Sequence, residues 1–484
     1  MRVASALGRA RTNVACACVR RTRARCGAGR GTIVLRESSR AKDGASAPHV
    51  AFVGWEMIDA NASAAGARSE ALVRGALDRG WRVSVLSSAD RGEGGGGRVA
   101  ALGARTARVE ANRGGSWEAA MGGSEAPDCV VFDRFLSEEA HSWRVRELWP
   151  NAARVLDMQD CHALRRARER AATTGAGMDA VVRAAPGARD RDQMREIASV
   201  QRSDLTLVCS PVEARWLERE CGVVGGKLRV ASFFEDNVDT SIFRDDADFD
   251  RRRGFVTIGT FMHKPNVDSV AWLREEVWPL VRERLPDATM RVYGSYMTEA
   301  HRARFHDPRR GFEVVGFAPD LNEAMSSARV LLAPLRFGAG IKGKVLDAWK
   351  RGTPVVTTPI GSEGTVRGVD EFWRPSSAPI DPDHGWGGFG DRVSASDIAE
   401  AAVRLHEDRE LWALARRAGA NIINEDFSSS VNIPDVLDAI EHVMQNIDVI
   451  RDEDYIGQAL WHHTEKSTTY FSKWIELKET GGNA

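Results

Sequence analysis

The chain has 484 residues, of which 43% are hydrophobic and 28% charged, and its 67 lysines and arginines nearly balance 68 acidic residues. This length exceeds what one hydrophobic core supports, so we expect two or three domains. The composition excludes a disordered, fibrous or disulfide-stapled protein, and without a run of about 18 apolar residues we expect no transmembrane segment.

The leader differs in charge from the rest of the chain. Residues 1–47 carry ten arginines and Lys42 against Glu37 and Asp43, a net charge of +9, which leaves −10 for the remainder. The segment is rich in Arg, Ala, Ser and Thr without a secretory apolar core, so we expect a disordered transit peptide for a plastid or mitochondrion. The alternative is a basic tail on a cytoplasmic protein. The acidic remainder argues against a nucleic-acid partner.

From Pro48 onward, short β-rich runs alternate with helical stretches such as Gly66–Asp78 and Glu138–Trp149. This alternation predicts an α/β fold with two Rossmann-like parallel-sheet domains facing a cleft. The strands expected in the first half are His49–Val53, Trp81–Leu86, Asp128–Asp133, Arg154–Asp157, Leu205–Cys209 and Leu228–Ala231. Those expected in the second half are Phe255–Gly259, Met290–Tyr293, Phe312–Val315, Val330–Ala333 and Val355–Thr358.

Five parts follow from this pattern. They are the leader 1–47, a Rossmann-like domain 48–235, a linker 236–253, a second Rossmann-like domain 254–425, and C-terminal helices with an aromatic tail 426–484. The tail contains Tyr455, Trp461, Tyr470, Phe471 and Trp474. We expect so much apolar surface to dock on the body.

The cysteines and the adjacent His462 and His463 give no metal signal. The seven cysteines show no CxxC spacing, which argues against a zinc site or disulfide framework and indicates a reducing compartment. Neighbouring histidines point to different faces of a regular element. We therefore predict no metal site.

The most informative segment follows an expected strand and turns through Gly338 and Gly340 into a helix whose first turn holds Lys342 and Lys344. A helix N-terminus carries partial positive charge and unpaired N–H groups, so cations there are unfavourable unless an anion binds. We therefore predict a phosphate site. The alternative is an ion pair of Lys344 with Asp347 at i+3 and a solvated Lys342.

Further polar groups lie near this helix. Asp347 is expected to accept hydrogen bonds from vicinal hydroxyls, unless it forms only a local ion pair. The loop Ile360–Gly364 offers backbone amides, including that of Gly361, and the carboxylate of Glu363, unless it is only a turn. Lys264 precedes another expected helix and either reaches the same anion or is a plain loop lysine.

The runs Pro334–Ala348 (PLRFGAGIKGKVLDA) and Gly352–Gly364 (GTPVVTTPIGSEG) resemble the nucleotide-sugar half of family 4 glycosyltransferases, which have the GT-B fold. The resemblance extends to bacterial-type members through Phe132–Glu139 and Leu156–Arg165, and it covers roughly Pro48 to the end of the chain. It implies sugar transfer from a UDP-, GDP- or ADP-sugar, with retention at the anomeric carbon and no obligatory metal or cofactor. The acceptor would be a glycan, a lipid or a small molecule, and a lipid would bring peripheral membrane contact.

The resemblance also implies roles for individual residues. Lys264 and Lys344, with Arg336 or Lys342, would hold the leaving diphosphate, and Lys344 would assist catalysis. The paired glutamates of the family correspond here to Ala339 and Asp347, so the first acid is absent and the second is shortened. Ribose binding by Asp347 remains expected.

In the first half, the glycine-rich loop of the family corresponds to Ser63–Gly66, where Ala65 and Gly66 are small enough for a ligand to approach closely. Asp157, Asp160 and His162 follow a strand end on the side where the acceptor is expected. The resemblance puts a ligand-facing histidine here, so His162 is a candidate catalytic residue; a helix-capping or partly buried imidazole is the alternative. The neighbours Asp133 and Arg134 are expected to form a structural ion pair.

Other functions fit the same pattern. The missing acid at Ala339 suits a catalytically inactive nucleotide- or glycan-binding relic. A sugar-nucleotide epimerase shares the two-lobed architecture and acts without an acceptor. A structural protein would use the aromatic tail for dimerisation.

Overall fold

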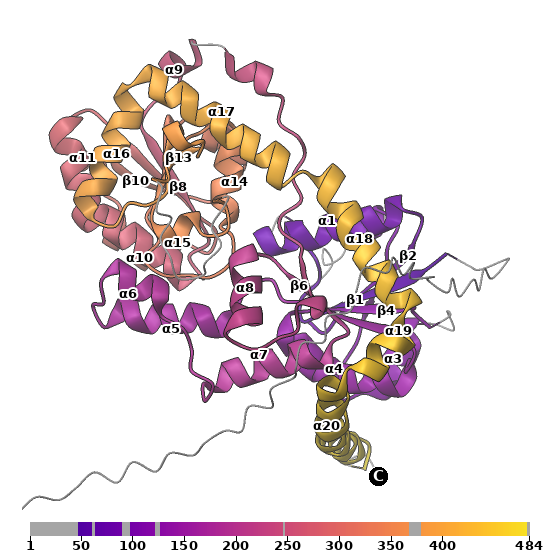
Figure 1. Cartoon of the computed structure of the whole chain (residues 1–484). Coiled ribbons are helices and arrows are strands. Elements are labelled where there is room, and N and C mark those ends of the chain that lie inside the picture. Colours follow the sequence, from indigo (N-terminus) through magenta and orange to yellow (C-terminus); the bar gives the residue numbers. More distant parts are fainter. Residues whose placement is uncertain are drawn as a thin grey trace, which may run out of the picture. The chain divides into compact units, whose positions relative to one another are not determined.

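In the computed structural model, residues Ala47–Ala484 belong to one compact unit. The residues that the structure describes are 47–60, 63–89, 97–121, 126–244, 247–366 and 379–481. The expected transit peptide therefore lies outside the described residues. The compact unit contains two parallel sheets, each covered by helices (Figure 1).

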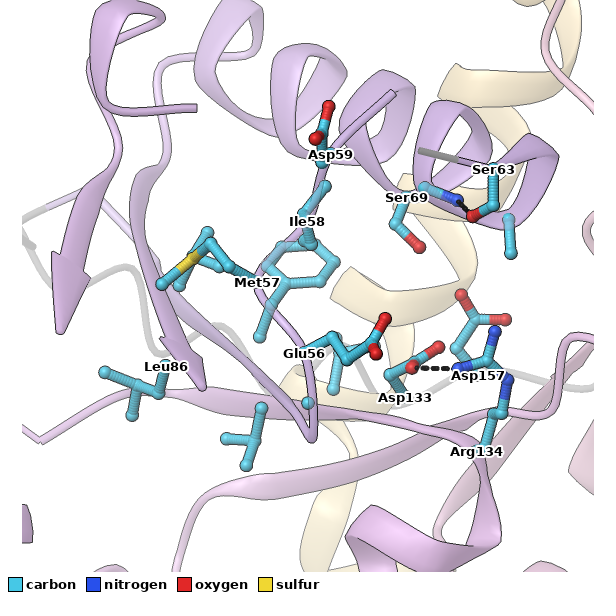
Figure 2. A pocket seen from close by; sticks show the side chains of 17 residues that line it. Glu56, Met57, Ile58, Asp59, Ser63, Ser69, Leu86, Asp133, Arg134 and Asp157 are labelled. Carbon is cyan, nitrogen blue, oxygen red and sulfur yellow. Dashed lines mark hydrogen bonds and ion pairs between the residues drawn. The ribbon is translucent and has the colours of Figure 1, made fainter. Parts of the chain in front are cut away.

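A seven-stranded sheet forms the first half, with strand order β3-β2-β1-β4-β5-β6-β7 and parallel pairing throughout. The carboxyl ends of β1, β4 and β5 line a pocket (Figure 2). The strands are β1 His49–Gly54, β2 Arg82–Ser87, β3 Arg105–Arg108, β4 Cys129–Asp133, β5 Ala153–Asp157, β6 Leu205–Val208 and β7 Leu228–Val230. The helices are α1 Ala64–Asp78, α2 Gly97–Ala101, α3 Gly114–Met121, α4 Arg134–Leu148, α5 His162–Thr173, α6 Met178–Arg183, α7 Arg191–Arg202, α8 Pro211–Arg219 and the 3₁₀ turn η1 Gly225–Lys227.

A six-stranded parallel sheet forms the second half, with strand order β10-β9-β8-β11-β12-β13. Its strands are β8 Phe255–Ile258, β9 Met290–Tyr293, β10 Phe312–Gly316, β11 Val330–Ala333, β12 Val355–Thr357 and β13 Gly388–Phe389. Its helices are α10 Lys264–Trp272, the π-helical turn η3 Leu273–Val277, α11 Trp278–Arg284, α12 Glu299–Phe305, η4 Pro308–Arg310, α13 Leu321–Ser326, α14 Gly343–Lys350, α15 Pro359–Ser362, η5 Pro382–His384, α16 Ala395–Glu407 and α17 Arg409–Asp426.

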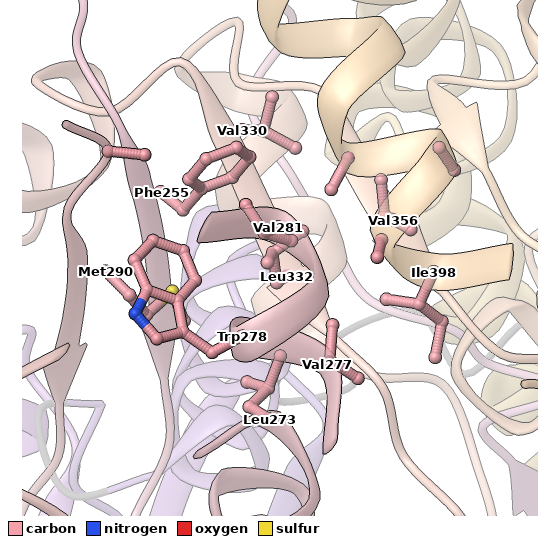
Figure 3. Packing of buried hydrophobic residues seen from close by; sticks show 14 of the residues in the cluster. Phe255, Leu273, Val277, Trp278, Val281, Met290, Val330, Leu332, Val356 and Ile398 are labelled. Carbon is pink, nitrogen blue, oxygen red and sulfur yellow. The ribbon is translucent and has the colours of Figure 1, made fainter. Parts of the chain in front are cut away.

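Helices of the second half cover its sheet through large apolar side chains. Trp278 of α11 is buried against Phe255 of β8, with ring centroids 5.8 Å apart, and Figure 3 shows both rings beside Val281. The indole Nε1 of Trp278 donates to the carbonyl of Arg310 at 2.7 Å, so the buried ring leaves no orphaned N–H group.

The segment expected to be a bare linker packs on the second half. It forms η2 Thr240–Arg244 and α9 Ala247–Arg251, and both Phe243 and Phe249 are buried. The ring of Phe249 lies 5.3 Å from that of Trp412 in α17. Two buried phenylalanines therefore suffice to hold the segment between the two halves against the second half.

The C-terminal helices return to the first half. They are α18 Ser429–Gln445, α19 Ile447–Glu453 and α20 Tyr455–Gly481. Val436 and Ile440 of α18 share a hydrophobic cluster with Leu72 and Val73 of α1, and Figure 1 shows α18 beside α1. Across the described helices, none is both long enough and apolar enough to cross a bilayer.

Of the five aromatic residues in the tail, Trp461 of α20 is the one that is buried. Its indole donates to the carbonyl of Arg202 at 2.6 Å, and the guanidinium of Arg154 lies 4.0 Å from its ring centre. The other four aromatic residues are exposed by 83, 72, 62 and 51%: Tyr455, Tyr470, Phe471 and Trp474. The prediction of a docked aromatic tail was wrong for these four, because α20 is a single helix that turns only one face to α4 and α7.

Candidate functional site

The predicted phosphate loop connects the carboxyl end of β11 to the N-terminus of α14. Gly340 has φ +66°, a left-handed conformation that favours glycine, and a Cβ there would lie 3.1 Å from the Cβ of Asp160 in the first half. Because α14 begins at Gly343, Lys342 is the N-cap residue rather than a first-turn residue, whereas Lys344 does lie in the first turn. The loop therefore faces the first half at the start of a helix.

The two lysine ammonium groups lie against the loop. Nζ of Lys342 donates to the carbonyls of Gly340 and, at 3.0 Å, Ala339, and Nζ of Lys344 donates to Oδ1 of Asn266 at 2.7 Å. Neither forms an ion pair with a carboxylate among the described residues. Burial lowers the pKa of both, and the proximity of Lys342 helps to bring the pKa of Lys344 to about 7. Partly desolvated cations at a helix N-terminus favour a bound anion.

Asp347 lies one turn further along α14. Its carboxylate accepts a hydrogen bond from Nη1 of Arg351 at 3.1 Å and lies 3.6 Å from Nζ of Lys350. The alternative ion pair with Lys344 was therefore wrong. The side chain is 29% exposed and is still available to a ligand hydroxyl.

The loop after β12 forms the short helix α15. The amide of Gly361 donates to the carbonyl of Thr358 at 2.9 Å and to its hydroxyl at 3.3 Å, so the cap of α15 already uses the amide predicted for the donor. The carboxylate of Glu363 accepts hydrogen bonds of 2.9 and 2.6 Å from Arg168 of α5. A donor sugar at this loop would therefore contact a Glu363 carboxylate whose negative charge is already compensated by Arg168.

Two cations that the resemblance assigns to the diphosphate have acidic partners elsewhere. Lys264 is 77% exposed and pairs with Glu169 at 2.7 Å. Nε of Arg336 donates to Asp268 at 2.8 Å. Both residues line a surface pocket beside α10, and the structure does not join them to the ammonium groups of Lys342 and Lys344.

A pocket of the first half contains the predicted Ala65, Gly66 and Asp157 (Figure 2). Asp157 is buried, and both its oxygens accept hydrogen bonds from Nη1 of Arg68, at 2.7 and 2.6 Å. A Cβ on Gly66 would lie 2.1 Å from the carbonyl oxygen of Asp59, so only glycine fits there. The Arg68 pair restricts Asp157 to binding an acceptor through its remaining lone pairs.

Two residues of this pocket region have strained backbones. Arg134 and Gln159 have φ of 63° and 60°, which costs a non-glycine residue roughly 1–3 kcal/mol and is concentrated at functional sites. Nε2 of Gln159 donates to Asp133 at 3.1 Å and to Asp157 at 3.2 Å. Arg134 pairs with Asp133 at 2.8 Å, as predicted. Sequence reasoning missed the roles of Gln159 and Arg68: Arg68 lies in no motif, and Gln159 lies within the family-like run Leu156–Arg165 but was not singled out.

His162 and Asp160 lie apart from that pocket, on the side of the phosphate loop. Nε2 of His162 is 3.3 Å from Asp160, and its ring meets that of Phe135 edge-on at 5.4 Å. Although burial acts in the opposite sense, the ion pair with Arg165 lowers the pKa of Asp160. A Cβ on Gly340 would lie 3.1 Å from that of Asp160, so Asp160 lies beside the phosphate loop, and its expected role on the acceptor side stays a prediction.

A buried carboxylate also joins the halves at this loop. Oε1 of Glu213 in α8 accepts the N–H of Gly340 at 2.9 Å and that of Cys161 at 3.0 Å. Burial raises its pKa to about 8. Across the part of the chain that the structure describes, no group of three His, Cys, Asp or Glu residues is suited to hold a metal ion.

Comparison with known proteins agrees with this geometry. The family model described as glycosyl transferases group 1 matches residues 252–383, which contain the phosphate loop. A search of curated proteins finds no match.

Solved structures match over most of the chain. A glycosyltransferase from Rickettsia africae is 11% identical with a TM-score of 0.58, and the match covers 83% of this chain and 100% of that one. HepE of Anabaena, solved with UDP and glucose, is 12% identical with a TM-score of 0.57, covering 81% and 99%. The predicted GT-B fold and the likeness to group 1 glycosyltransferases are thereby confirmed.

Proposed function

We propose that the protein transfers a sugar from a nucleotide diphosphate donor to an acceptor. One observation carries this proposal: Lys342 and Lys344 gather at the start of α14 without a carboxylate partner within ion-pair distance among the described residues. A diphosphate would give both ammonium groups a directly bound anionic partner. The presence of UDP and glucose in the similar Anabaena protein supports a nucleotide-sugar donor.

The proposed chemistry is mainly electrostatic. As the bond between the anomeric carbon and the diphosphate breaks, its electron pair stays on a β-phosphate oxygen, where the ammonium groups and the loop amides stabilise it. The acceptor oxygen bonds to the anomeric carbon and its proton passes to the departing diphosphate. We propose retention of configuration and no requirement for a metal, with Asp347 holding the ribose.

We further propose that the acceptor presents uncharged hydroxyl groups. The first-half pocket is lined by Glu56, Asp59, Asp133, Arg134 and Asp157, and the buried Arg68 compensates the charge of Asp157. Carboxylates accept hydrogen bonds from hydroxyls and repel phosphates. A neutral glycan or small saccharide therefore fits this lining better than a phosphorylated acceptor.

A catalytically inactive relic is the second candidate. It is favoured by Ala339, which stands where the family has an acid and packs in a hydrophobic cluster of the first half. Such a protein would bind nucleotide without turnover.

The test is a thermal-shift screen of the chain from Ala47 against UDP-, GDP- and ADP-sugars, followed by a donor hydrolysis assay. A ligand that binds the folded state raises the melting temperature. A shift with turnover supports a transferase, and a shift without turnover supports the relic. Absence of any shift would contradict both.

A further inference from the structure

We propose that Glu213 occupies the phosphate loop in place of the diphosphate, and that the donor must displace it; this rests on the proposed function. Glu213 lies on α8 of the first half and is fully buried. Its Oε1 joins the halves, because it accepts the N–H groups of Gly340 in the loop and of Cys161 at the start of α5. A carboxyl oxygen that accepts a loop N–H occupies the position that a phosphate oxygen would take there.

Glu213 does not cap its own helix, although its position in α8 would allow it to. Its spacing from Ser210 is that of a helix capping box, in which the glutamate accepts the backbone N–H of the N-cap residue. Here the hydroxyl of Ser210 caps α8 by accepting from Val212 at 3.2 Å, while the glutamate turns to the loop. Its second oxygen, Oε2, is buried without a hydrogen-bond partner among the described residues. An orphaned buried acceptor is costly, so helix capping does not explain this arrangement.

Glu213 and a diphosphate would compete for the same backbone N–H group, that of Gly340. Asp160 and Glu363 add negative charge around it, and Lys342 supplies positive charge. The Gly340 N–H already donates to Oε1 of Glu213 at 2.9 Å, so a diphosphate oxygen cannot accept that N–H while the carboxyl group stays in place. Glu213 must therefore leave Gly340 before the donor takes that amide. The apparent donor affinity then equals the intrinsic affinity multiplied by the fraction of free molecules in which Glu213 has already left Gly340.

The experiment is calorimetric titration of the full chain with UDP. The titration is carried out at pH 9, above the Glu213 pKa of about 8, where Glu213→Gln replaces a charged acceptor by a neutral one that forms hydrogen bonds about half as strong. Glu213→Asp keeps the charge but shortens the reach. Both variants should bind UDP roughly 5- to 10-fold more tightly than the original protein, a gain of about 1.0–1.4 kcal/mol.

Glu196 supplies the matched control. It is also buried and accepts two backbone N–H groups, those of His162 and Ala163, but both belong to its own half. Glu196→Gln should leave UDP affinity within about twofold. If Glu213 instead holds the loop in its binding-competent shape, both Glu213 variants will bind UDP more weakly, which overturns the proposal.

Amide hydrogen exchange gives a readout that does not need the variants to be stable. UDP should speed exchange at Cys161, because its N–H loses Glu213 as acceptor. Unchanged exchange at Cys161 in the UDP complex would overturn the proposal. If the original protein binds UDP and neither Glu213 variant binds it more tightly, the displacement proposal is refuted but the proposed function stands. If none of these proteins binds UDP, GDP or ADP, the proposed function is refuted as well.

Discussion

Arg168 and Glu363 form an ion pair that fastens α5 of the first half to the loop after β12. Nη1 and Nη2 of Arg168 donate to the two carboxylate oxygens at 2.9 and 2.6 Å, and the Arg168 side chain is fully buried. Nη1 also donates to the carbonyl of Gly338 at 2.9 Å. One guanidinium therefore fixes both loops that line the proposed donor site.

Removing one partner of this ion pair should cost far more than removing both. Arg168→Met leaves the buried charge of Glu363 uncompensated and should lower the free energy of unfolding by about 3–5 kcal/mol. The double variant Arg168→Met with Glu363→Gln should lose less, because neither charge of the pair is left buried without the other. Urea denaturation measures both. Strict additivity of the two single changes would show that the charges are not coupled.

The low pKa of Lys344 makes donor binding depend on pH. Below its pKa of about 7, Lys344 is charged in the free protein; above it, the side chain is neutral and must take up a proton when the diphosphate binds. UDP affinity should therefore fall as pH rises from 6.5 to 8.5, by at most about tenfold per pH unit. Titration calorimetry across this range measures it. Lys344→Arg stays charged and should flatten the profile, so identical profiles would contradict this assignment.

Asp347 should distinguish a nucleotide from a bare diphosphate. Asp347→Asn removes the charged acceptor proposed to bind the ribose hydroxyls, which should weaken UDP binding by about 10- to 100-fold. Inorganic pyrophosphate lacks a ribose, and its affinity should change little. An equal loss for both ligands would show that Asp347 acts on the helix rather than on the ribose.

The tail should be stabilised by a single aromatic residue. Trp461→Ala removes a buried indole and should lower the free energy of unfolding by about 3–5 kcal/mol. The exposed pair Phe471→Ser with Trp474→Ser should change it by less than about 1 kcal/mol. Urea denaturation compares the two variants. A large loss in the second would mean that these rings are covered.

The strands and the phosphate loop could be predicted because their signals are local. Buried parallel strands such as β1 and β11 are runs of apolar residues, and glycine with lysine before a helix marks an anion site. The strand β3 was missed because Arg105–Arg108 is a polar edge strand, and β13 because Gly388–Phe389 has only two residues.

Contacts made by the tertiary fold could not be predicted in this way. Glu213 and Gly340 are 127 residues apart, and Arg168 and Glu363 are 195 apart. No spacing rule links residues so distant. The partners of Lys264 and Arg336 were missed for the same reason. Glu169, which pairs with Lys264, lies on α5, and Asp268, which pairs with Arg336, lies on α10.

The central claim is that the ammonium groups of Lys342 and Lys344 hold the diphosphate of the donor. Calorimetric titration with UDP and GDP tests it, comparing the original protein with Lys342→Ala, Lys344→Ala and the double variant. Lys473→Ala is the control, because Lys473 lies on α20 and pairs with Glu147 of α4 at 2.7 Å. The account predicts a loss of about 10²- to 10⁴-fold in the double variant and little change in the control. Unchanged UDP and GDP affinity in the double variant would contradict it.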